Sequence, residues 1–188
     1  MMGYGLFFWL PSFLVRSHGM ELLDASLYFG AILLVGGIAG IWLGGVLGDK
    51  LGAANKASYA RVPAVAFITT IPFYVAGVLS PSLGWAFFVF LVPTALGLVW
   101  LGPVLSVVQH MVPANMRATA SAVFLFVNNL IGIGLGTSLL GLISDVLNAR
   151  FAEEALRYAI LSGTGFYIVA AALFFIAAPR LARDWHHG

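Results

Sequence analysis

The chain has 188 residues, of which 61% are hydrophobic and only 9% are charged, and its mean hydropathy is +1.01. This composition excludes a water-soluble domain of this length and predicts a protein whose solvent is lipid. The sequence contains no cysteine, which excludes a disulfide framework and a thiolate metal site, and its net charge of +2 excludes nothing.

Six apolar runs follow one another along the chain, over residues 3–15, 25–48, 62–80, 85–108, 118–144 and 158–178. None alternates with the two-residue period of a porin strand, and lipid offers no water to unpaired backbone groups. We therefore predict an all-α, polytopic membrane helical bundle of six helices. About 20 residues are needed to cross the hydrocarbon core, so the last five runs qualify and the first is interpreted as a truncated helix. A signal peptide would also explain a short first run, but no basic residue precedes it.

The second run carries four glycines at intervals of four residues: Gly36, Gly40, Gly44 and Gly48. This spacing stacks them on one side of a helix, which we call the glycine face, where the lack of side chains lets another helix approach closely. We interpret the glycine face as a packing surface for a partner outside this chain.

Charge placement predicts the orientation in the membrane. If the five complete runs alternate across the bilayer, six cations and two acids fall on one side, and three cations and five acids fall on the other. The side richer in Lys and Arg should face the cytosol. The connections near residues 52–57 and 113–116 and the C-terminus are then cytoplasmic, and the expected location is a bacterial inner membrane.

The runs also divide into two units of three, residues 1–80 and 81–188, which start in opposite directions. Such a 3+3 inverted repeat is common among secondary transporters. The whole chain, residues 1–188, is therefore expected to form one six-helix bundle.

Several segments carry a resemblance to a known family. Residues 44–52 contain a glycine pair, an acid, a base and a further glycine, and they resemble the signature loop of the major facilitator superfamily between its eighth and ninth helices. Residues 112–121, 128–132 and 141–145 resemble the eleventh helix of the spinster-like branch, and residues 4–19 resemble its seventh. The resemblance implies the C-terminal half, helices seven to twelve, of a twelve-helix transporter.

The same resemblance implies a cytosolic gate. In the family the acid of this loop is thought to dock on a helix of the opposite half, so Asp49, Lys50 and Arg117 are expected to form a latch that closes only with that half. An acid near a helix C-terminus meets the negative end of the helix dipole and needs another partner. The alternative is a solvated acid that ends a helix.

Neutral polar and aromatic side chains within the runs are the candidates for contact with a substrate: Tyr4, Phe8, Trp9, Ser12, Trp100, Asn128 and Asn129. Asn128, Gly132 and Gly136 lie near one face by the helical repeat. The alternative is structural, with the amide bonded to a neighbouring helix and the glycines serving packing. No run contains a charged residue away from its ends, so the charges that couple transport are expected in the absent half.

These observations predict a fragment of a secondary transporter that moves an amphipathic or lipid-like small molecule by alternating access, together with a missing N-terminal half. The alternative is a stand-alone membrane protein that homodimerises through the glycine face to form a pore or carrier. The sequence shows no acid pair, metal set, Ser/His arrangement or nucleotide loop for an enzyme, and no basic stripe for nucleic acid. We expect no cofactor and no bound metal.

Overall fold

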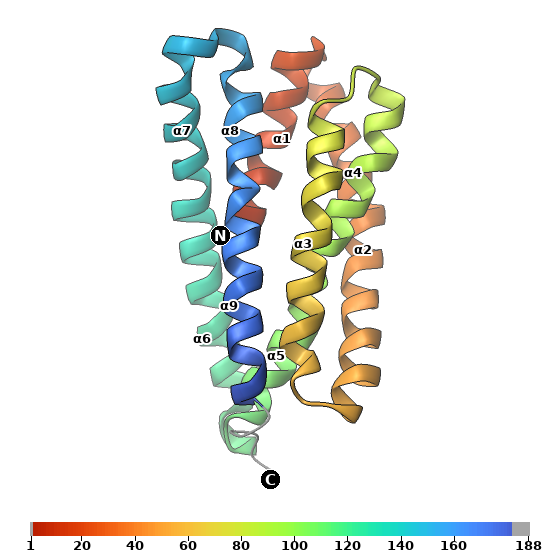
Figure 1. Cartoon of the computed structure of the whole chain (residues 1–188), viewed down its shortest axis with the longest axis vertical. Helices are drawn as coiled ribbons and strands as arrows, with labels where there is room; N and C mark the ends of the chain where they lie inside the picture. The colour runs from red at the N-terminus through yellow and green to blue at the C-terminus, as the bar shows by residue number, and fades with distance from the viewer. Residues whose placement is uncertain (1, 182–188) are drawn as a thin grey trace.

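The structure is a computed structural model that describes residues 2–181, and these are almost entirely helical, with no strand among them (Figure 1). The elements in chain order are α1 (Met2–His18), α2 (Leu22–Ala54), α3 (Ser58–Val78), α4 (Leu83–Leu98), α5 (Leu101–His110), η1 (Ala114–Met116), α6 (Arg117–Asn129), η2 (Leu130–Leu135), α7 (Gly136–Phe151), η3 (Ala152–Glu154), α8 (Ala155–Gly163) and α9 (Gly165–Leu181). Arg183 and Asp184, which enter the charge count above, lie outside the described residues.

The predicted helical bundle is confirmed. Five stretches of the described chain are long and apolar enough to cross a membrane: α2, α3, α4 with α5, η1 through α7, and α8 with α9. The helix α1 has 17 residues and is not among them. The connections after α2 and α5 lie at the lower end of Figure 1, and those after α1, α3 and α7 lie at the upper end.

The second helix is longer than the predicted run. It continues through Asp49 to Ala54, so the whole signature segment, residues 44–52, is helical and only residues 55–57 join α2 to α3. Asn55 makes this tight turn, because its backbone N–H donates to the carbonyl of Leu51 and its side-chain Oδ1 accepts from the N–H of Ala57 at 2.9 Å.

The glycine face packs inside the chain, against α4 and α5. A Cβ built on Gly40 would lie 2.8 Å from the Cα of Ala95, and one on Gly44 would lie 2.9 Å from the Cα of Val99. Gly48 faces the ring of Pro103 at 3.2 Å. The interpretation of this face as a surface for an outside partner is therefore wrong, because the backbone of α4 and α5 already covers it. The homodimer alternative loses its predicted interface for the same reason.

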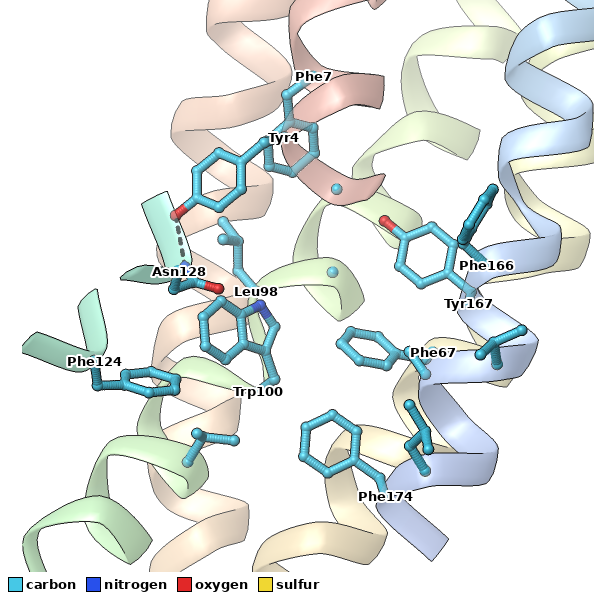
Figure 2. Close-up of a pocket in the computed structure, with 16 residues that line it drawn as sticks. Tyr4, Phe7, Phe67, Leu98, Trp100, Phe124, Asn128, Phe166, Tyr167 and Phe174 are labelled. Atoms are coloured by element: carbon cyan, nitrogen blue, oxygen red, sulfur yellow. Dashed lines mark hydrogen bonds between the residues drawn. The ribbon is translucent and has the colours of Figure 1, made fainter. Parts of the chain in front are cut away.

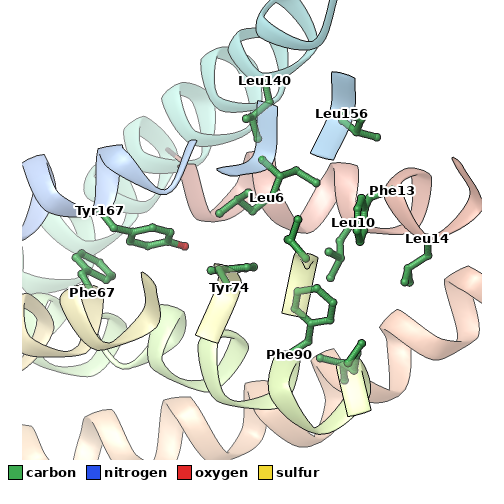
Figure 3. Close-up of a cluster of buried hydrophobic side chains, with 14 of the residues drawn as sticks. Leu6, Leu10, Phe13, Leu14, Phe67, Tyr74, Phe90, Leu140, Leu156 and Tyr167 are labelled. Atoms are coloured by element: carbon green, nitrogen blue, oxygen red, sulfur yellow. The ribbon is translucent and has the colours of Figure 1, made fainter. Parts of the chain in front are cut away.

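Buried apolar side chains from several helices meet in one core (Figure 3). Leu6, Leu10, Phe13 and Leu14 of α1 are buried against side chains of α3, α4, α7 and α8, with Tyr74, Phe90, Leu140 and Leu156 among them. The helix α3 packs along both α4 and α9, and α2 packs along α4. Helices on either side of residue 80 therefore interlock in one body.

Candidate functional site

A cavity of about 400 Å³ lies beside the first turn of α1 (Figure 2). Six helices line it, through Gly3, Tyr4, Phe7, Phe67, Gly97, Leu98, Trp100, Val104, Phe124, Asn128, Phe166, Tyr167, Val169, Ala170, Leu173 and Phe174. None of these side chains carries a charge. The cavity therefore offers an apolar, largely aromatic wall with a few neutral polar groups.

Three polar side chains gather at one corner, which we call the polar corner and define as Tyr4, Trp100 and Asn128, and the hydroxyl of Tyr167 lies on the opposite wall. The Nδ2 of Asn128 donates to the hydroxyl of Tyr4 at 3.4 Å, and the ring of Trp100 meets Phe124 edge-on with centroids 6.3 Å apart. A Cβ on Gly132 would lie 2.5 Å from the Tyr4 ring. The missing side chain at Gly132 is what lets Tyr4 reach Asn128.

The opposite wall, which we call the aromatic floor, is formed by Phe67 of α3 and by Tyr167 and Phe174 of α9. The ring of Phe67 lies 5.3 Å from that of Tyr167 and 5.8 Å from that of Phe174. The Tyr167 hydroxyl points toward Gly3 and Gly97, where a Cβ would lie 3.4 and 3.8 Å away. The hydroxyl therefore lies between α1 and α4, next to both glycines.

The polar corner lies just before an irregular part of its helix. The segment η2 (Leu130–Leu135) is a π-helix and separates α6 from α7. A π-turn interrupts the regular repeat and often occurs at functional sites. The regular helical repeat that predicted one shared face for Asn128, Gly132 and Gly136 therefore does not hold through this segment. Both glycines still face α1, because Gly132 contacts Tyr4 and Gly136 lies against Gly5.

Of the seven predicted substrate contacts, the structure brings Tyr4, Trp100 and Asn128 together, and the other four do not line this cavity. Trp9 instead joins α1 to α7, since its Nε1 donates to the carbonyl of Thr137 at 2.9 Å. Phe8 is 62% exposed.

Sequence reasoning missed the aromatic floor. Its residues belong to helices that are apolar on all sides, so no periodicity marks the face that lines a cavity. That Tyr167 near the start of α9 lies opposite Gly97 of α4 becomes visible only once the register of these two helices is known.

The predicted latch residues lie at the lower end of the bundle. Asp49 and Lys50 are exposed on α2, and Arg117 begins α6. In the described part of the chain Asp49 and Arg117 form no ion pair with each other, and the Nε of Arg117 is buried without a hydrogen-bond partner. Residues 2–181 also contain no group of three His, Cys, Asp or Glu side chains that could hold a metal ion.

The fold and the cavity define a membrane protein of the helical-bundle class with a neutral, aromatic internal cavity. The sequence profile of the Major Facilitator Superfamily matches residues 1–137, and the chain belongs to this superfamily.

Known relatives agree with the predicted branch. The chain is 28% identical to an MFS-type efflux pump of Mycolicibacterium smegmatis and 30% identical to protein spinster homolog 3 of Danio rerio, over 97% and 95% of its own length and 42% and 40% of theirs. It superposes with a TM-score of 0.88, at 28% identity, on an inward-facing, unoccupied bacterial homolog of the human lysosomal transporter Spinster, covering 100% of this chain and 47% of that one. The expected likeness to the spinster-like branch is confirmed, and the chain spans less than half the length of these relatives.

Proposed function

We propose that this chain is the C-terminal half of a secondary transporter that moves an amphipathic or lipid-like small molecule by alternating access with an N-terminal half. The observation that carries the proposal is the polar corner, where a neutral amide and a phenol stand within an apolar wall. Such a wall suits hydrocarbon, and a few convergent polar groups suit a head group. A bacterial Spinster homolog has been solved in an inward-facing conformation, both occupied and unoccupied, and an inward-facing state is one of the two that alternating access requires.

The proposed location is a bacterial inner membrane, with the C-terminus in the cytosol. The connections after α2 and α5 share one end of the bundle, and the cations Lys56, Arg61 and Arg117 lie in or next to them. Positively charged connections are retained on the cytoplasmic side.

Asn128→Leu in the full-length transporter is expected to lower kcat/KM for substrate uptake about tenfold. The reason is that leucine removes the proposed hydrogen bond between the Asn128 amide and the substrate, a loss of about 1 to 1.5 kcal/mol. Uptake by the purified transporter in vesicles measures this. The matched control is Asn148→Leu, an exposed asparagine near the end of α7, which should transport normally. Equal uptake by both variants would contradict a substrate role for Asn128.

We further propose that Asp49, Lys50 and Arg117 belong to a cytosolic latch completed by the other half. The unpartnered Nε of Arg117 supports this, because a buried donor without an acceptor is costly. Asp49→Asn should then shift the transporter toward the inward-open state about threefold, as loss of a partly exposed charge interaction is worth about 0.5 to 1 kcal/mol.

Spin labels can report this shift, because this half of the transporter has no native cysteine and accepts a label at a chosen position. The distances between labels on the two halves give the inward-open and outward-open populations. Asp24→Asn, an exposed acid in the first turn of the same helix, is the control and should leave the distances unchanged. If Asp49→Asn also leaves them unchanged, Asp49 is only a solvated acid.

A further inference from the structure

Two phenol rings lie side by side at the wall of the cavity, Tyr74 of α3 and Tyr167 of α9 (Figure 3). Their planes are 24° apart and their centroids are 6.2 Å apart. Tyr74 is 1% exposed and Tyr167 is 4% exposed, so both side chains are shielded from lipid. Of the two, only Tyr167 lines the cavity, and Tyr74 lies behind it.

This tyrosine pair has more hydrogen-bond donors than it can use within the protein. Neither hydroxyl has a hydrogen-bond partner of normal geometry in the described part of the chain, although the two lie close enough to interact with each other. A bond between them would use one O–H proton and leave the other unused. Because Tyr74 is enclosed by other side chains, the arrangement that suits both has Tyr74 donating to Tyr167, and Tyr167 donating into the cavity. A buried donor without an acceptor is destabilising, and an acceptor on a ligand would remove that cost.

The polar corner, on the opposite side of the cavity, also presents donors. The Nδ2 of Asn128 donates to the hydroxyl of Tyr4, so the proton of that hydroxyl can be donated onward. The indole N–H of Trp100 can only donate, and Figure 2 shows its nitrogen on the side of the ring that faces Tyr167. No residue that lines the cavity is charged. A ligand that matches this lining therefore carries oxygen acceptors, whereas an ammonium group only donates and needs a counter-charge.

We propose that Tyr167, oriented by Tyr74, is a second substrate-binding group, which selects amphipathic molecules with an uncharged oxygen acceptor over amines of the same chain length. A ketone or an ester carbonyl is such an acceptor. This proposal rests on the proposed function, because it places the head group of the same substrate at the polar corner. Tyr167 contacts the acceptor, and Tyr74 is a positioning residue that directs the Tyr167 proton into the cavity. The rings of Phe67 and Phe174 then lie beside the hydrocarbon chain.

The test uses monolaurin, an uncharged glycerol ester, labelled with carbon-13 at its carbonyl and added to the full-length transporter in lipid nanodiscs. The infrared stretching band of a carbonyl moves to lower frequency when its oxygen accepts a hydrogen bond, and the label separates this band from those of the lipids. The saturable part of the shifted band gives the affinity. Tyr167→Phe keeps the ring and removes only the hydroxyl. The control is Tyr158→Phe, which removes the hydroxyl of an exposed tyrosine on α8 that does not line the cavity.

Tyr167→Phe is expected to weaken monolaurin binding about tenfold and to abolish the saturable shifted band, because one hydrogen bond is lost. Tyr74→Phe should weaken binding about threefold and move the band part of the way back, whereas a merely structural role would leave the band position unchanged. Dodecylamine should compete weakly for the native transporter and equally weakly for Tyr167→Phe. Tyr158→Phe should behave as the native protein.

Unchanged affinity and an unchanged band in Tyr167→Phe would overturn the proposal and assign the Tyr167 hydroxyl to a structural water. Tighter binding of dodecylamine than of monolaurin, or no binding of monolaurin to the native transporter, would also overturn it. In any of these cases the proposed function stands if Asn128→Leu still lowers uptake, and both fail if Asn128→Leu transports normally.

Discussion

Gly40→Ala is expected to destabilise the bundle by about 3 kcal/mol, although it adds a single methyl group. The new Cβ would lie 2.8 Å from the Cα of Ala95, and both partners are backbone, so neither can rotate away. Carbon atoms in contact normally stand about 3.5 to 4.0 Å apart, so α4 would have to move as a stiff unit. That movement would also separate Gly36 and Gly44 from α4, and overpacking of this kind costs about 1 to 3 kcal/mol, occasionally more.

Unfolding in a denaturing detergent, followed by circular dichroism, measures the effect. The control is Gly45→Ala, five residues further along α2, where a Cβ would meet no atom within 4 Å. Alanine is the better helix former, so this variant should be as stable as the native chain or slightly more so. Equal unfolding midpoints for the two variants would show that the glycine face is not held against α4.

Phe90→Ala is expected to cost about 3 kcal/mol of stability. The side chain projects from α4 toward α3 and is completely buried. The centroid of its ring lies 6.2 Å from that of Tyr74, and a Cβ built on Gly77 would lie 2.6 Å from the Phe90 ring. In lipid the loss comes from packing contacts and not from transfer out of water, because lipid chains are as apolar as the core. The space that the removed ring filled becomes a void, and the side chains around it lose their packing contacts.

The same unfolding assay provides two checks on this prediction. Phe88→Ala, two residues earlier on α4, removes an identical side chain that is 65% exposed, and it should change stability little. Gly77→Ala alone should destabilise, and the double variant Gly77→Ala with Phe90→Leu should recover part of the loss, because the smaller side chain leaves room for the added methyl group. If Phe88→Ala costs as much as Phe90→Ala, the assigned packing of α4 is incorrect.

The cavity shows how far sequence reasoning reached at the candidate site. Asn128 and Tyr4 were recognisable because a hydrogen-bonding side chain is rare within an apolar run and needs a partner there. That the partner of Asn128 is Tyr4, 124 positions away, depends on how α1 lies across α6, and Gly132 decides that approach. Trp9 was predicted to contact substrate, yet its indole N–H is bonded to the carbonyl of Thr137.

The membrane class, the six helical segments and a closely packed glycine face could all be predicted from the residues alone. Each follows from composition or from spacing along one helix, because lipid requires every backbone group to be paired within its own helix. The packing of the helices was needed to show that α4 and α5 cover the glycine face, and that Phe67, Tyr167 and Phe174 share a wall. In lipid no difference in hydrophobicity separates an inward face from an outward one, so the contacts between helices are set by shape and by interhelical hydrogen bonds, and they appear only when all helices are in place.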